Sequence, residues 1–176
     1  DLEGEADRLM DVRNGLPYRT GSVDAIFSEH FVEHLTREEA AEFFRECHRV
    51  LKPGGACRVA TPDLEDLVES YSRKTWKKKE WIDRFGYGWI PNRCVMMNLS
   101  MREWGHKHVF DFEDLKMVGN LAGFPLVNRR ALRRSTFPEL RGLEDRDDSI
   151  VVEMEKGGEG NLGRLPLVSI LIPAYG

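Results

Sequence analysis

Short apolar runs alternate with amphipathic segments along the first half of the chain. The run 23–27 lies between a turn-like Gly-Ser pair and polar residues, and the run 56–60 follows a Pro-Gly-Gly segment. Between these runs, residues 37–51 place apolar side chains at helical spacing, and Thr36 with Glu39 forms a capping-box signature at the helix start. Strands separated by amphipathic helices predict a parallel sheet that is covered by helices on its faces.

The same patterns predict further elements. We expect a glycine of residues 52–55 to end the first helix in a left-handed cap, and a new helix to start at residues 62–63. Another helix is expected over residues 111–121, and strands over 126–132 and 149–155. The inward faces of the two later helices are expected to hold Leu64, Leu67 and Val68 in the first, and Phe112, Leu115, Val118 and Leu121 in the second.

Helical and strand periodicity is weak from residue 75 to residue 107, where all four tryptophans lie. Trp76, Trp81, Trp89 and Trp104 could form a lid or a platform for sugar rings above the sheet. A small satellite core or a dimer contact explains the same residues equally well. The neighbouring basic run 74–79, like the run 129–134, either meets phosphate or an anionic membrane surface or is simply solvated.

Composition limits the class of protein. The chain has 176 residues, of which 41% are hydrophobic and 32% charged, so we expect a soluble globular protein. The net charge of −4 argues against a general nucleic-acid binder, and no apolar stretch is long enough to span a bilayer. Three cysteines at unrelated spacings predict neither disulfides nor a CxxC metal site and favour the cytoplasm. A first residue other than Met suggests a piece of a longer polypeptide.

Three motifs in order resemble the second half of a class I S-adenosylmethionine-dependent methyltransferase. They are residues 11–18 (DVRNGLPY), 21–26 (GSVDAI) and 49–55 (RVLKPGG). The resemblance covers residues 1–155 and implies an α/β, Rossmann-like sheet with an aromatic-rich insertion, lacking the first strand and the glycine-rich cofactor loop. Later stretches resemble a bacterial subgroup associated with glycan biosynthesis, namely residues 105–115, 122–124 and 142–156.

The resemblance also implies residues for the cofactor, S-adenosylmethionine. Asp11 would contact the adenine with Val12 beside the ring, and the alternative is that Asp11 is only a turn residue. Ser28 and Glu29 would lie beside the methionine part, and Asp1 would hold the ribose hydroxyls. Because the glycine-rich loop lets a cofactor approach the backbone, we expect the chain as given to bind S-adenosylmethionine poorly.

His30, Glu33 and His34 have the i, i+3, i+4 spacing that brings side chains to one face of a helical turn. One hypothesis makes a histidine the general base for a hydroxyl, oriented by Glu33. A second makes His30, Glu33, His34 and His106 ligands of a divalent metal, by similarity to metal-dependent O-methyltransferases. A third is purely structural. His106 and His108 are also expected, with the four tryptophans, on the substrate side.

The reaction implied is methyl transfer to an oxygen of a saccharide or glycan-linked acceptor. Two alternatives stay open. The chain could be a non-catalytic scaffold or interaction module beside a glycosyltransferase, or a small-metabolite O-methyltransferase of the quinone-pathway type.

The C-terminal segment has a resemblance of its own. Residues 156–166 read as a linker, and residues 167–176 resemble the opening strand of a family 2 glycosyltransferase. We expect this apolar strand to be disordered, or to pair with an edge strand or a neighbouring chain. A homodimer through such an exposed edge is a possible consequence.

Overall fold

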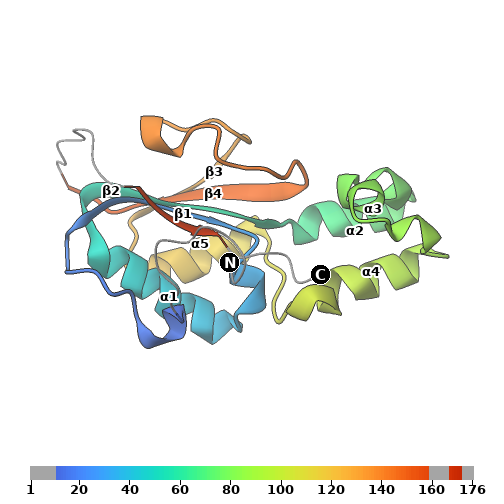
Figure 1. The fold of residues 1–176 in the computed structure, drawn as a ribbon, viewed down its shortest axis with the longest axis horizontal. Helices are drawn as coiled ribbons and strands as arrows, with labels where there is room; N and C mark the ends of the chain where they lie inside the picture. The colour runs from blue at the N-terminus through green and yellow to red at the C-terminus, as the bar shows by residue number, and fades with distance from the viewer. Residues whose placement is uncertain (1–10, 159–166, 172–176) are drawn as a thin grey trace.

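The computed structural model describes residues 11–158 and, for the backbone alone, residues 167–171. The strands of these two parts form one five-stranded mixed sheet (Figure 1). The strand order is β3-β4-β2-β1-β5, and β1 pairs in parallel with both β2 and β5. β4 runs antiparallel to both β2 and β3, so the sheet is mixed, and the parallel pairing predicted for the first half of the chain is confirmed for β1 and β2. The strands are β1 Val23–Glu29, β2 Leu51–Pro62, β3 Leu126–Arg130, β4 Ser149–Glu155 and β5 Leu167–Leu171.

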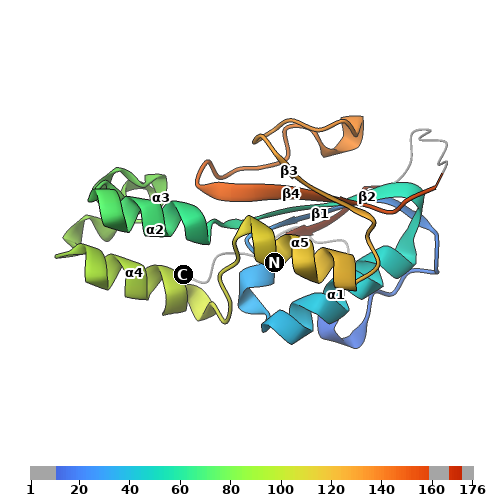
Figure 2. The same ribbon diagram turned by 180° about the vertical axis from the view of Figure 1, so that it is seen from behind.

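Two helices, α1 Arg37–Val50 and α5 Phe112–Leu121, cover one face of the sheet (Figures 1 and 2). The capping box of α1 is present: the Thr36 hydroxyl accepts from the Glu39 amide, and the Glu39 carboxylate accepts from the Thr36 amide. Leu115 and Val118 of α5 are fully buried as predicted. Leu121 is 64% exposed, because the buried face of the helix continues to Gly119 and Ala122 instead. The predicted inward face of α1 is confirmed by the burial of Ala40, Phe43, Phe44, Cys47 and Val50.

The Lys-Pro-Gly-Gly segment differs from its prediction. α1 ends at Val50, and β2 begins at Leu51 and runs through the segment, so no glycine caps the helix. The second glycine instead permits a close approach of two backbones. A Cβ on Gly55 would lie 2.6 Å from the backbone oxygen of Asp24, a separation that side chains do not tolerate.

Three further helices form a separate lobe beyond the carboxyl end of β2: α2 Leu64–Arg73, α3 Glu80–Arg84 and α4 Arg93–Arg102 (Figure 1). This lobe has its own apolar core, so the satellite-core explanation holds for part of the aromatic segment. Val68 of α2 is 50% exposed, because the lobe packs against α2 on the side of Leu67 instead. The buried residues of this core are Leu67, Trp76, Trp81, Ile82, Ile90, Met96 and Val109.

The second face of the sheet is covered by the segment 131–148 and contains a buried charge cluster (Figure 1). Arg58 of β2 is completely buried. Its guanidinium donates to Glu144 and, over 2.7 Å, to Glu153, and both carboxylates are fully buried. The pair with Glu144 attaches the segment to the sheet, whereas Glu153 belongs to β4. The Glu29 carboxylate adds to this attachment by accepting from the amides of Asp145 and Arg146.

The C-terminal strand β5 occupies the sheet edge beside β1, with Ala25 opposite Leu167 and Glu29 opposite Leu171. Of the alternatives for this strand, pairing with an edge strand is therefore confirmed for residues 167–171. Most of the predicted linker, the end of the chain and Asp1 lie outside the described residues. Among the described helices, none has the length and apolar character needed to cross a bilayer.

Candidate active site

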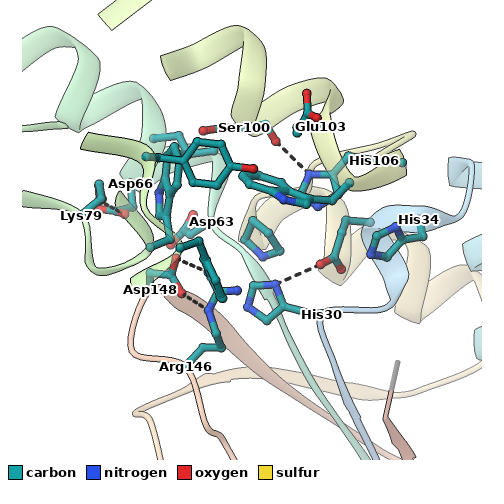
Figure 3. A pocket seen from close by; sticks show the side chains of 18 residues that line it. His30, His34, Asp63, Asp66, Lys79, Ser100, Glu103, His106, Arg146 and Asp148 are labelled. Atoms are coloured by element: carbon teal, nitrogen blue, oxygen red, sulfur yellow. Dashed lines mark hydrogen bonds and ion pairs between the residues drawn. The ribbon is translucent and has the colours of Figure 1, made fainter. Parts of the chain in front are cut away.

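A cavity of about 730 Å³ lies where the helical lobe meets the carboxyl ends of β1 and β2 (Figure 3). Its wall comes from four parts of the chain. Residues 30–34 follow β1, residues 62–67 follow β2 into α2, residues 79–106 belong mainly to the lobe, and Arg146 and Asp148 come from the segment over the second sheet face. Ligands of parallel sheets bind at this end of the strands, so we take the cavity as the candidate site.

Glu33 lies at the polar end of this cavity and is completely buried. Its Oε2 accepts a hydrogen bond from the Thr61 hydroxyl over 2.8 Å, and its Oε1 lies 3.1 Å from His30 Nδ1. Burial alone would raise the pKa of the carboxyl, but the neighbouring His30 outweighs it and lowers the pKa below its usual value. Glu33 is therefore a buried, charged group with imidazoles around it.

Both ring nitrogens of His30 are engaged. Nδ1 faces Glu33, and Nε2 lies 2.9 Å from the Ser149 hydroxyl oxygen at the start of β4. The backbone of His30 has a φ of 47°, a left-handed conformation that is strained for a residue other than glycine and that turns the chain sharply after β1. These contacts fix the ring between the sheet and Glu33.

His106 is held differently. Its Nδ1 lies 2.8 Å from the backbone oxygen of Ser100, and since a carbonyl only accepts, Nδ1 must carry the proton. In the neutral ring, Nε2 therefore keeps its lone pair. Burial lowers the pKa of His106 more than the charge of Glu33 raises it, so the imidazole is neutral at pH 7. A neutral imidazole with a fixed tautomer in a cavity suits either a general base or a metal ligand.

One atom each of Glu33, His34 and His106 fits the donor set of a divalent metal, because these atoms lie within 4.8 Å of one another. One carboxylate and two imidazoles suit a borderline cation such as zinc. The partners of Glu33 and His106, the Thr61 hydroxyl and the Ser100 carbonyl, would orient the ligands. His30, which the sequence placed in this set, is not part of that cluster.

An aromatic wall lies opposite Glu33 and consists of Trp81, Tyr87 and Trp104. The three ring centroids lie 5.3–5.7 Å apart in edge-to-face arrangements. The ring of His106 continues the wall at 5.5 Å from Trp104. Trp104 has a φ of 58°, so two of the residues lining the cavity, His30 and Trp104, have the left-handed backbone typical of functional sites.

The other predicted substrate residues lie elsewhere. Trp76 is buried in the core of the lobe, and Trp89 is 62% exposed outside the cavity. His108 pairs with Asp114 of α5 over 2.8 Å and packs on Phe110. Sequence reasoning missed Asp63, Asp66 and Lys79, together with Arg146 and Asp148. Of these five residues, the sequence could have indicated only Asp63, because it directly follows the end of a strand.

The predicted cofactor residues are placed as follows. Asp11 is 41% exposed, and its carboxylate caps the turn at Val12–Asn14 and pairs with Arg13, which lowers its pKa to about 2. Val12 is buried in the main core, and Glu29 is occupied by the amides of the segment over the second sheet face. Ser28 is fully buried, and within the described residues its hydroxyl oxygen has no hydrogen-bond partner.

The fit to S-adenosylmethionine is thus partial. The charged, accessible carboxylate of Asp11 and the unsatisfied hydroxyl of Ser28 could accept or donate hydrogen bonds to a bound nucleoside or amino acid. Glu29 lacks this freedom, because its oxygens already bind backbone amides.

Comparisons with known proteins agree with the fold. Residues 3–59 match a family described as a methyltransferase domain. A stretch of 58 residues is 41% identical to a Mycolicibacterium smegmatis protein named "Probable S-adenosylmethionine-dependent methyltransferase", and covers 31% of this chain and 22% of that protein. The chain thus spans less than a quarter of this relative.

Several solved structures with similar folds are methyltransferases of low sequence identity to this chain. PigF with SAH is 17% identical, with a TM-score of 0.52 over 83% of this chain and 33% of that one. The apo form of the S-adenosylmethionine-dependent methyltransferase SibL is 17% identical, with a TM-score of 0.52 over 86% and 35% of the two chains. An O-methyltransferase family protein from Burkholderia thailandensis is 15% identical, with a TM-score of 0.50 over 88% and 35%. The described chain therefore has the Rossmann-like α/β fold of class I S-adenosylmethionine-dependent methyltransferases, and its first third matches the methyltransferase domain family.

Proposed function

We propose that the chain is part of an enzyme that transfers a methyl group from S-adenosylmethionine to an oxygen of a saccharide or glycan-linked acceptor. The observation that supports this best is the neutral, tautomer-fixed imidazole of His106 in a cavity at the carboxyl ends of β1 and β2. The family match supports the methyl donor. The aromatic wall supports a ring-shaped acceptor, because aromatic faces offer apolar area for stacking.

The chain's own residues would handle the acceptor and its proton. S-adenosylmethionine, when bound, supplies an electrophilic methyl group. His106 Nε2 would accept the proton of the acceptor hydroxyl, whose oxygen would take the methyl group as the carbon–sulfur bond of the donor breaks and S-adenosylhomocysteine leaves. The positive charge then on the imidazole is stabilised by the Ser100 carbonyl at Nδ1–H and by the buried carboxylate of Glu33. His30 and Thr61 hold Glu33 in place, and the wall of Trp81 and Trp104 positions the ring.

For the donor, the proposal retains the residues implied by the resemblance. Asp11 and Val12 would bind the adenine, and Ser28 the methionine part. Asp1 would hold the ribose, and Glu29 would contribute only through the segment it anchors.

A metal-assisted version of the reaction is the second candidate. It is favoured by the three ligand atoms of Glu33, His34 and His106 within 4.8 Å. A divalent cation there would lower the pKa of a bound hydroxyl and so replace the base. In that version His106 is a ligand and takes no proton.

The glycan-linked acceptor rests on the glycosyltransferase-like segment at residues 167–176, which suggests that both activities serve one glycan. A homodimer through the edge strand remains part of the proposal.

The test is transfer of labelled methyl from S-adenosylmethionine by the whole protein to a panel of oligosaccharides, with and without a chelator. If the transferred label resists base hydrolysis, the methyl group is bound as an ether, which supports O-methylation of a sugar hydroxyl. Activity that a chelator abolishes, and that one equivalent of zinc restores, assigns the metal version. Absence of transfer to every acceptor favours the scaffold alternative, and transfer only to small phenolic metabolites favours the quinone-type alternative.

A further inference from the structure

Carboxylates outnumber cationic side chains around the cavity. Lys79 and Arg146 are the two permanently cationic residues of its lining, and each already pairs with a carboxylate of the same lining, Asp66 and Asp148. The carboxylate-bearing residues of the lining are Glu33, Asp63, Asp66, Glu103 and Asp148. The side chains of the lining other than histidine therefore have a negative net charge.

A buried carboxylate supports the cavity as a ligand site. Glu33 is completely buried and lines the cavity, and within the described residues its Oε1 accepts no well-aligned hydrogen bond. A buried carboxylate oxygen without a full set of donors attracts a cation or a hydrogen-bond donor.

The aromatic wall favours the same charge. The faces of Trp81, Tyr87 and Trp104 carry the negative part of a ring quadrupole, which attracts a cation within about 6 Å. In this structure, the guanidinium of Arg146 already lies 4.8 Å from the ring centroid of Phe85, which also lines the cavity. The site thus combines aromatic faces with carboxylates, the two groups that together recognise an ammonium.

An adjoining hollow extends the acidic surface. It shares Asp63, Asp66, Lys79 and Asp148 with the main cavity and adds mainly acidic side chains to them. The basic runs offset part of this charge, because Arg129 pairs with Asp63 and Lys79 with Asp66. The carboxylates that the second hollow adds are Glu65, Glu69, Glu80 and Asp147.

We propose that the acceptor carries a protonated amine, as an amino sugar does, and that the cavity binds this ammonium between its aromatic wall and its carboxylates. This rests on the proposed function, whose acceptor class it narrows. The acceptor hydroxyl faces His106, and the ammonium lies toward Glu103 and Trp104. A phosphorylated acceptor is disfavoured, because each cationic side chain among the described residues of the lining has a carboxylate partner.

The test is calorimetric binding of three probes to the whole protein in the presence of S-adenosylhomocysteine. The probes are methyl glucosaminide, methyl glucoside and glucose 6-phosphate. We expect the amine to bind about tenfold more tightly than the neutral sugar, and the phosphate most weakly. Raising the salt concentration should reduce the preference of the site for the amine, because exposed carboxylates are screened.

Matched variants locate the site. Trp104→Leu and Glu103→Gln should each reduce the preference for the amine several-fold, whereas Trp89→Leu and Glu113→Gln, which lie outside the cavity, should not. Circular dichroism of each variant establishes that it is folded.

Two affinities would overturn the proposal: equal binding of methyl glucosaminide and methyl glucoside, or tighter binding of glucose 6-phosphate than of methyl glucosaminide. A third contrary result would be displacement of methyl glucosaminide by S-adenosylmethionine but not by S-adenosylhomocysteine. The last would mean that the negative charge serves the sulfonium of the donor. Failure of the proposed function can be told apart from failure of this proposal. In the first case the protein transfers methyl to no acceptor, whereas the binding constants of the three probes are unaffected.

Discussion

The polar end of the cavity is organised by individual residues far apart in the sequence. Glu33 gathers Thr61 and His30, and the Ser100 carbonyl sets the tautomer of His106. The spacing of His30, Glu33 and His34 predicted that they act together, and all three line the cavity. The position of His106 beside them was expected only from the resemblance to metal-dependent O-methyltransferases. Spacing could not predict it, because it depends on how the lobe packs more than 70 residues further along the chain.

The partly buried His48 predicts how the stability of the protein depends on pH. Burial lowers the pKa of His48, whose ring packs against Phe124, so the folded state binds fewer protons than the unfolded state below about pH 6.5. His48 therefore contributes a stability that is present above that pH and is lost as the pH falls. Urea unfolding between about pH 7.5 and 5.5 should show a smaller decline in the free energy of unfolding for His48→Gln than for the wild type. An identical decline in both proteins would contradict this account.

Elements whose signals are local were predicted well. The capping box fixed the start of α1 at the predicted residue, and the period-2 alternation gave β4 with its observed bounds. The Lys-Pro-Gly-Gly segment was misassigned, because a glycine that permits close backbone packing looks the same in sequence as one that caps a helix.

The capping box gives a prediction for α1. Thr36→Ala removes the side-chain acceptor of the Glu39 amide and should lower the free energy of unfolding by about 1 kcal/mol. Thr75→Ala is the control and should change it little, because Thr75 is exposed and its side chain makes no cap hydrogen bond. Urea titrations of the two variants measure the difference, and equal midpoints would show that the cap contributes nothing.

The role of Gly55 gives a second prediction at this scale. Gly55→Ala should destabilise the protein by about 1 to 3 kcal/mol, because the added methyl group meets the Asp24 carbonyl and both strands must move apart. Gly88→Ala is the matched control, since nothing lies within 4 Å of its Cβ position. Thermal unfolding of both variants checks this. Equal melting temperatures of Gly55→Ala and Gly88→Ala would mean that the two strands move apart at no cost in stability.

At the scale of the whole molecule, the fold class followed from the motifs but the assembly of the layers did not. The alternation of strands and helices predicted the α/β class, while the antiparallel pairing of β4 with both neighbours depends on how the segment 131–148 crosses the sheet. Nothing in the local pattern of that segment indicates that it is attached to the sheet through Arg58. A buried guanidinium is recognised only once its two carboxylates are placed.

That buried cluster predicts a large effect on stability. Arg58→Met leaves the buried Glu144 without its guanidinium partner and Glu153 with Arg130 alone, and should lower the free energy of unfolding by about 3 to 5 kcal/mol. Arg134→Met, at an exposed position of the same segment, should have little effect. Chemical denaturation compares them. A loss below about 1 kcal/mol for Arg58→Met would mean that the segment is held mainly by its apolar contacts.

The central claim is that the cavity between the lobe and the sheet is the site of methyl transfer, with His106 as the base. The most direct measurement is kcat for transfer of labelled methyl to a saccharide acceptor by His106→Asn and, as the matched variant outside the cavity, His108→Asn. We expect a loss of at least about 100-fold for His106→Asn and nearly full activity for His108→Asn. Equal rates for the two variants would contradict the assignment of the cavity.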